Sequence, residues 1–187
     1  MATKTWLLRG GVLAACLCVS APYVLAWGEA RGWQRHSSSA GRYKVDLPQG
    51  ELQRQTQTVE TAVGKIDMHM VLSFNEAEVS AYTVMYNDFP VNGLDQAQKE
   101  NALTGGRDGA LRNVNGTLLH EKKISLDGHP GREFHFSATV QGNKARGAWR
   151  LYIVNNRLYQ IGVLRFGQIP DAGSLDRFFG SFALVDG

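Results

Sequence analysis

Two short turns in the C-terminal half of the chain constrain its fold most. Gly142-Asn143 and Asn155-Asn156 each separate two segments in which apolar and polar residues alternate. Such alternation is typical of β-strands with one buried face. Asn and Gly also tolerate the positive φ angles that two-residue hairpin turns require. With one more segment before them, these turns predict an antiparallel meander of strands over residues 117–126, 132–140, 145–154 and 157–166.

The same turns predict which residues lie opposite one another. Counting back from the first turn pairs Phe136 with Trp149 and His135 with Arg150. Counting from the second turn places Gly162 opposite Trp149. A glycine at that position leaves room for the indole ring, so this register is sterically reasonable.

A polar stretch, LDGHPGREFHF at residues 126–136, joins the first two strands of the meander. Its glycines and its proline favour turns. We therefore expect a five-residue loop over 127–131, with His129 at its exposed tip. Such a loop would bring Lys123 beside His135 on the neighbouring strand.

This register gathers charged and aromatic side chains on one face of the sheet. We predict a ligand-binding patch made of Lys123, Glu133, His135, Arg150, Tyr152 and Tyr159. Its mixture of charges and rings would suit a small anionic or aromatic ligand. The alternative is a salt-bridged sheet face without a ligand, because cross-strand charge pairs are common stabilisers. No set of four convergent zinc ligands is visible, so we predict no metal and no cofactor.

The first half of the domain is expected to supply further strands and one helix. Alternation predicts strands over 42–48, on both sides of Val63-Gly64, and over 80–89. The pattern then changes to that of a helix, with Asp95 as its N-cap and an end near Gly116. A strip of small residues would let this helix approach a sheet closely; it consists of Ala102, Gly106, Gly109 and Ala110.

A second helix is expected near the C-terminus. Leu175, Phe178, Phe179 and Phe182 follow the i, i+3, i+4, i+7 spacing of a helix with one apolar face. We expect that face to cover the side of the sheet with the largest apolar residues of the meander, namely Phe134, Phe136, Trp149, Leu151 and Leu164.

Residues 1–26 have the pattern of a secretory signal peptide. Lys4 and Arg9 precede a continuous apolar run, and Val24-Leu25-Ala26 is a small-residue cleavage pattern. Two alternatives stay open. The segment resembles an uncleaved signal anchor, because its apolar run nearly reaches the length that spans a bilayer. The sequence LAAC also resembles a lipoprotein signal, which would place a lipid on Cys16.

Cleavage after Ala26 would change the chemistry of the chain. It would remove both cysteines, Cys16 and Cys18, and with them any disulfide or thiolate site. The loss of two basic residues would lower the formal net charge from +3 to +1, so nucleic-acid binding gains no support. The remaining chain is expected to be a flexible lead-in over 27–41 and a single domain over 42–184.

The sequence lacks the common local motifs of catalysis. It contains no G-x-S-x-G elbow, no H-E-x-x-H, no phosphate-binding loop with its lysine and no G-x-G-x-x-G. A catalytic site can still assemble from distant residues, but these absences favour a protein that is not an enzyme.

Three segments resemble the PsbP-like families: GRYKVDLP at 41–48, LDGHPGREF at 126–134 and FFGSFAL at 178–184. The order of strands, helix, meander and C-terminal helix is also similar, in particular to small exported bacterial proteins of that group. Their fold is shared with the Ran-binding nuclear-import factor Mog. The resemblance implies an α+β fold, an α/β/α sandwich with a central antiparallel meander sheet flanked by helices. It also implies a non-enzymatic accessory or binding role, but it carries over no functional residue, because the matching positions are turn glycines and core aromatics.

We therefore expect a secreted or periplasmic, non-catalytic binding or assembly module with an unknown protein or small-molecule partner. Membrane contact is expected only if the signal segment is uncleaved or Cys16 is lipidated. Two alternatives remain: a secreted hydrolase with a site assembled around His135, and a membrane-tethered lipoprotein of the same fold.

Overall fold

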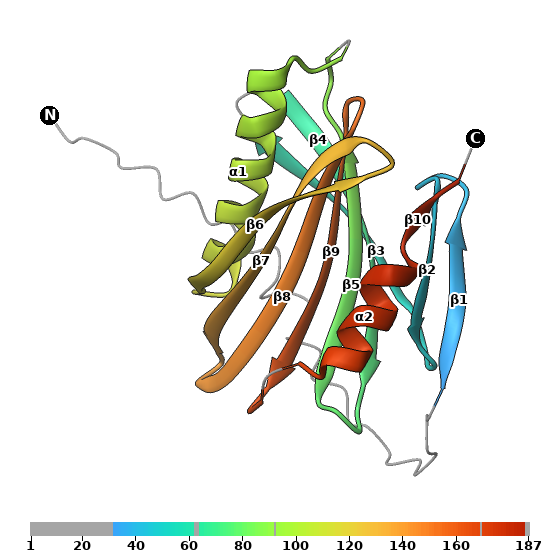
Figure 1. The fold of residues 1–187 in the computed structure, drawn as a ribbon, viewed down its shortest axis with the longest axis vertical. Helices are drawn as coiled ribbons and strands as arrows, with labels where there is room; N and C mark the ends of the chain where they lie inside the picture. The colour runs from blue at the N-terminus through green and yellow to red at the C-terminus, as the bar shows by residue number, and fades with distance from the viewer. Residues whose placement is uncertain (1–31, 62–63, 92, 169, 186–187) are drawn as a thin grey trace, which may run out of the picture.

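The chain folds into three layers (Figure 1). Helix α1 (Gln96–Asn113) lies on one face of a seven-stranded sheet, and helix α2 (Ala172–Ser181) lies on the other face together with a smaller sheet. The predicted α+β fold, with helices on both faces of an antiparallel sheet, is confirmed. The predicted signal peptide, including Cys16 and Cys18, lies outside the described residues. The computed structural model describes residues 32–61, 64–91, 93–168 and 170–185.

The seven-stranded sheet contains the predicted meander as four consecutive neighbours, with three earlier strands beside it. Every neighbouring pair is antiparallel. In sheet order the strands are β3 (Gln53–Thr61), β4 (Gly64–Asn75), β5 (Ser80–Asp88), β9 (Arg157–Phe166), β8 (Asn143–Val154), β7 (His129–Val140) and β6 (Thr117–Leu126).

The smaller sheet includes a strand that the sequence did not predict. Its strands are β1 (Trp33–Ser38), β2 (Tyr43–Pro48) and β10 (Ala183–Leu184), with β2 in the centre. The expectation of a flexible lead-in over 27–41 is therefore wrong for β1, while 27–31 lies outside the described residues. Trp33 packs edge-on against Tyr82 with 5.5 Å between ring centroids. This contact and the main-chain pairing with β2 hold a segment that lacks a clear apolar alternation.

Three two-residue turns connect the strands of the meander. They are Asp127-Gly128, Gln141-Gly142 and Asn155-Asn156. The last is the predicted one, and Trp149 faces Gly162 as expected. A Cβ atom at Gly162 would lie 2.2 Å from the Trp149 ring, so the indole fills the space that the glycine leaves.

The other two turns differ from the prediction, and the register differs with them. The turn at Gln141-Gly142 lies one residue earlier than expected, so His135 faces Ala148 instead of Arg150. Gln141 has a positive φ of 50°, an uncommon angle for a residue other than glycine, asparagine or aspartate. This shift by two pairing positions leaves each side chain on its predicted face.

The loop expected at 127–131 is the tight turn Asp127-Gly128, and β7 already begins at His129. Lys123 therefore faces Arg132 and not His135. Side chains alternate between the two faces of a sheet, so a shift by three positions, an odd number, moves Lys123 to the opposite face.

Helix α1 begins as predicted. The Asp95 carboxylate accepts a hydrogen bond from the Gln98 backbone N–H at 2.8 Å, and the Gln98 side chain accepts one from the Asp95 N–H at 2.9 Å. This reciprocal pair is a capping box, which satisfies two N–H groups at the helix start. At Gly106 a Cβ atom would lie only 3.2 Å from Leu151 and 3.3 Å from Leu158, so this glycine brings the helix close to the sheet.

The C-terminal helix is present, but it covers the other face of the sheet. Phe178 and Phe179 of α2 pack in the cluster that contains Tyr82 and Ile161. The apolar residues that α2 was expected to cover lie in the cluster under α1 instead. Both faces of these strands are apolar, as in any sheet that is covered on both sides. The alternation therefore did not distinguish which helix covers which face.

Candidate functional site

Part of the predicted patch is an ion-pair cluster around Glu133. Its carboxylate accepts hydrogen bonds from Arg150 Nε at 2.8 Å and from His135 Nε2 at 3.3 Å, and it pairs with Lys122 Nζ at 3.0 Å. Burial by itself would raise the pKa of Glu133, but these three partners outweigh it and lower the pKa to about 2. Arg150 directly faces Glu133 across the β7–β8 pair.

This cluster lies beneath α2. The Arg150 guanidinium carbon is 4.5 Å from the centroid of the Phe179 ring, a cation–π distance. The Glu133 side chain is only 8% exposed. Its carboxylate is thus already fully engaged by protein cations, as in the salt-bridged alternative considered for this face.

Of the other three predicted residues, one lies on the opposite face of the sheet and two lie in the core beside the cluster. Lys123 is on the α1 side of the sheet, with its Nζ 3.6 Å from Glu100 of that helix. Tyr152 and Tyr159 are core residues, exposed by only 4% and 2%. Both rings contact Phe182, which follows α2. The structure therefore keeps five of the six predicted residues on one face of the sheet, with Tyr152 facing Tyr159 and lying beside Arg150. Only Lys123 is moved to the opposite face.

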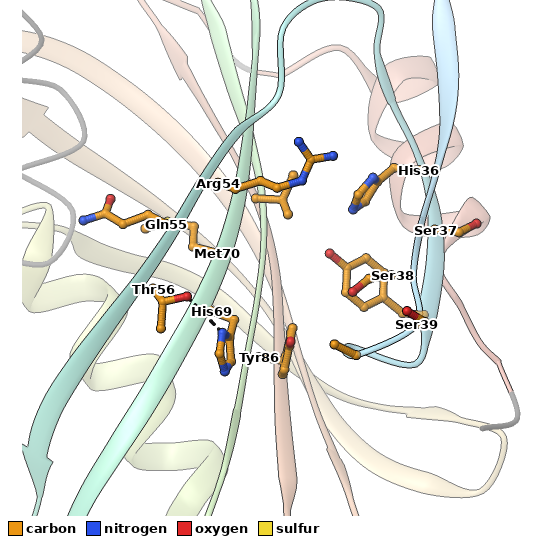
Figure 2. A pocket seen from close by; sticks show the side chains of 13 residues that line it. His36, Ser37, Ser38, Ser39, Arg54, Gln55, Thr56, His69, Met70 and Tyr86 are labelled. Carbon is orange, nitrogen blue, oxygen red and sulfur yellow. Dashed lines mark hydrogen bonds between the residues drawn. The ribbon is translucent and has the colours of Figure 1, made fainter.

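A pocket opens in a different place, between the β1–β2 hairpin and strands β3, β4 and β5 (Figure 2). Its volume is about 400 Å³, within the range of small-molecule sites. We call it the hairpin pocket. The residues that give it its chemical character are His36, Tyr43, Arg54, Thr56, His69 and Tyr86.

The wall formed by the β1–β2 turn is anchored to the large sheet. Arg157 forms two hydrogen bonds with Asp88, both at 2.7 Å, and donates a third to the Ala40 carbonyl oxygen at 2.9 Å. The Tyr159 hydroxyl donates to the Gly41 carbonyl oxygen at 2.7 Å. Side chains of β9 thus hold this turn in place, which preorganises one side of the pocket.

The pocket is basic. Figure 2 shows Arg54 of β3 and His36 of β1 on either side of one opening. Within the described part of the chain, Arg54 forms no ion pair with a carboxylate, and no Asp or Glu lines the pocket. His36 Nε2 is buried without a hydrogen-bond partner. Burial, and then the nearby Arg54 charge, lower the pKa of His36, so a neutral imidazole with a free N–H or lone pair faces this site near pH 7.

The lower part of the pocket is aromatic. The His69 ring stacks on Tyr86 with 4.7 Å between centroids, and its Nδ1 lies 3.0 Å from the Thr56 hydroxyl. The Arg157 guanidinium covers the Tyr86 ring at 4.6 Å. Burial, followed by the effect of Tyr86, raises the pKa of Tyr43, so its hydroxyl remains protonated. One cation, Arg54, and a neutral imidazole beside flat rings suit a small organic anion.

Sequence reasoning missed both basic residues of this pocket. His36 lies in RHSSSAG, which was assigned to the flexible lead-in, and Arg54 lies in a strand of polar residues. His69, on β4 between β3 and β5, was not among the residues predicted to bind a ligand. The missing signal was non-local: pairing of β1 with β2 places His36 over the sheet, and no short motif encodes that contact.

Among residues 32–61, 64–91, 93–168 and 170–185, no helix is long and apolar enough to cross a membrane. In the same part of the chain, no group of three or more His, Cys, Asp or Glu side chains is placed to hold a metal ion.

Comparisons with known proteins support the fold. No family model matches the chain, and no curated protein matches it in sequence. The solution structure of cyanobacterial PsbP (CyanoP) from Synechocystis sp. PCC 6803 matches with a TM-score of 0.53 and 14% identity, over 87% of this chain and 97% of that chain. A Pseudomonas aeruginosa protein of unknown function, PA94, matches with a TM-score of 0.37 and 6% identity, over 72% of this chain and 83% of that one. The chain has a PsbP-like fold, as the resemblance in sequence implied.

Proposed function

We propose that this protein is an exported, non-catalytic accessory module that binds a small organic anion in the hairpin pocket. The observation that carries this proposal is the pairing of Arg54, which has no carboxylate partner in the described chain, with the buried and unpartnered Nε2 of His36. A carboxylate would accept hydrogen bonds from both side chains. Hydrogen bonds to charged groups are stronger than neutral ones.

The aromatic part of the pocket favours a ligand that is more than an inorganic ion. His69 and Tyr86 present stacked rings in the same pocket as Arg54. A planar apolar group attached to the anion would gain contact area there. We therefore propose aromatic or other flat carboxylates as the ligand class.

The same residues support a role without catalysis. In the described chain, neither His36 nor His69 accepts or donates a hydrogen bond to a carboxylate, which a general base needs to fix its orientation. Around His135 the hydrogen-bonded partner is Glu133, with no hydroxyl nucleophile bonded to the ring. A secreted hydrolase centred on His135 would require such a nucleophile.

Benzoate titration followed by ¹H–¹⁵N NMR tests the binding proposal. We expect resonances of His36, Arg54 and Tyr86 to shift, with a dissociation constant on the order of 1 mM for so small a probe. Arg54→Gln should weaken binding by about tenfold or more. Lys65→Gln removes one positive charge from exposed β4, outside the pocket, and should leave binding unchanged. Equal weakening by both variants, or no shift at these residues, would contradict the proposal.

Export is tested separately by the mass of the protein purified from its own host. We expect a mass that corresponds to cleavage after Ala26. Addition of a lipid to Cys16 would indicate a membrane-tethered form, and the full-length mass would indicate a protein that is not processed. Either of these two results would contradict the secreted or periplasmic form proposed here.

A further inference from the structure

A second cavity lies on the opposite face of the large sheet, between α1 and the strands that α1 leaves partly uncovered. Its volume is about 320 Å³. We call it the helix cleft. Its walls are largely apolar and include Ile66, Met68, Met85, Phe89 and Leu158. No charged side chain lines it among the described residues.

Two buried amides face this cleft. Asn87 of β5 and Gln160 of β9 are only 4% and 6% exposed, and both line the cavity. Asn87 lies opposite Leu158, two residues from Gln160, so the two amides are diagonal neighbours on one face. Neither side chain forms a hydrogen bond within the described chain, and neither is among the side chains with a fully buried, unpartnered polar atom, so the two amide groups open onto the cleft. Each amide offers two N–H donors and a carbonyl acceptor to a molecule in the cleft.

Two glycines of α1 have different surroundings: one packs closely against the sheet, and the other lines the open cleft. Gly106 has Leu151 and Leu158 close to where a Cβ would lie, so packing of the helix on the sheet explains that glycine. Gly105 also lines the cleft, but a Cβ there would have no atom within 4 Å. Glycine is unfavourable in a helix, and packing gives no reason for it at position 105. An open cleft does.

We propose that the helix cleft binds a small, uncharged, largely apolar molecule that carries one amide-like group. The apolar walls would cover its body, while Asn87 and Gln160 would each supply a donor or an acceptor to its polar group. A charged ligand does not fit, because no opposite charge is available to compensate for its desolvation. This site is distinct from the hairpin pocket in both position and chemistry.

Benzamide is a suitable probe, because it combines a flat apolar ring with one primary amide. We expect benzamide to shift the side-chain amide resonances of Asn87 and Gln160 in ¹H–¹⁵N spectra, with a dissociation constant on the order of 1 mM. Toluene, which has the ring without the amide, should bind about tenfold more weakly, because it leaves both buried amides unpaired.

Two glycine substitutions make the test specific. Gly105→Leu should fill the cleft and weaken benzamide binding by about tenfold or more, while the better helix propensity of leucine keeps the protein folded. Gly180→Leu makes the same change in α2, where a Cβ also has open space and no cavity wall is affected. It should leave binding unchanged. Absence of shifts at Asn87 and Gln160, or undiminished binding in Gly105→Leu, would overturn the proposal.

Discussion

The two faces of the seven-stranded sheet are covered in different ways. On one face, α2 and the β1–β2–β10 sheet pack through aromatic rings, and the hairpin pocket is rimmed by Arg54 and His36. On the other face, α1 packs through glycine and aliphatic side chains, and the helix cleft contains no charge. The same strands thus line a basic pocket on one face and an uncharged, largely apolar cleft on the other, because the elements that cover the two faces differ.

The two helices contact charged residues of the same strands of the large sheet. On the α1 side, Arg132 of β7 pairs with Glu100 of the helix at 2.7 Å and with Glu121 of β6 at 2.8 Å. On the α2 side, Glu133 of β7 holds Arg150, which lies over Phe179. Both cavities lie towards β3, β4 and β5. The ion pairs between the helices and the sheet thus lie at β6 to β8, whereas both cavities lie at the other half of the sheet.

The largest expected effect comes from the packed part of the α1 face. Gly162→Val would place its side chain against the Trp149 ring, where even a Cβ would lie 2.2 Å away. Overpacking of this kind should lower the free energy of unfolding by about 3 kcal/mol. Urea denaturation measures it. A change below about 1 kcal/mol would show that this face is less tightly packed than we describe.

The next effect concerns the ion-pair cluster under α2. Glu133→Gln should lower the free energy of unfolding by about 2 kcal/mol at pH 7, because Arg150 and Lys122 lose their shared anionic partner. Glu60→Gln is the control, since its pair with Lys65 is exposed, and it should have almost no effect. Equal losses in both variants would contradict an anchoring role for Glu133.

The pH dependence of the same cluster sharpens this prediction. The pKa of Glu133 is lowered from 4.5 to about 2 in the folded protein, so the folded state binds fewer protons than the unfolded state in this range. The stabilisation is therefore present above pH 4.5 and is lost as the pH falls towards 2. The difference in stability between the wild type and Glu133→Gln should shrink over this interval in denaturation series.

A smaller effect, of opposite sign, is expected at the open part of the α1 face. Gly105→Ala should raise the free energy of unfolding by about 1 kcal/mol, because alanine favours a helix and its methyl group meets no atom there. Thermal unfolding gives the measurement. A loss of stability would mean that the cleft is closed in solution, and it would remove the contrast with Gly162.

The smallest effect should come from His36 in the hairpin pocket. Its pKa is lowered by burial and by Arg54, so the unfolded state takes up a proton at a higher pH than the folded state. Stability should therefore fall as the pH drops below 6.5. His36→Gln should flatten this part of the stability profile. An unchanged profile would place the imidazole in solvent instead of at the pocket wall.

Local turn chemistry explains what was predictable from the sequence. Asn155-Asn156 and the Trp149–Gly162 pair were predicted correctly, because turn residues and steric fit agreed. Pro130 and Gly131 misled the prediction of a long loop, since both lie within β7. Gly131 is needed in that strand because a Cβ there would meet the Tyr152 ring at 2.5 Å. Its function is close packing, and sequence alone does not separate that from turn formation.

The candidate sites were less predictable than the fold. Glu133, His135 and Arg150 were placed together because they lie on adjacent strands of one meander. The hairpin pocket requires β1 and β3, which are separated by the whole of β2, to approach each other in space. The helix cleft depends on how far α1 extends across the sheet. Both are consequences of packing between layers, which strand periodicity does not describe.

The most direct test of the account uses benzoate and benzamide on the same labelled sample. The two probes share a ring and differ mainly in charge. We predict that benzoate perturbs His36, Arg54 and Tyr86 in the hairpin pocket, whereas benzamide perturbs Asn87 and Gln160 in the helix cleft. If both probes perturb the same residues, or if benzoate leaves Arg54 unaffected, then the two faces do not carry one site for an anion and another for an uncharged molecule.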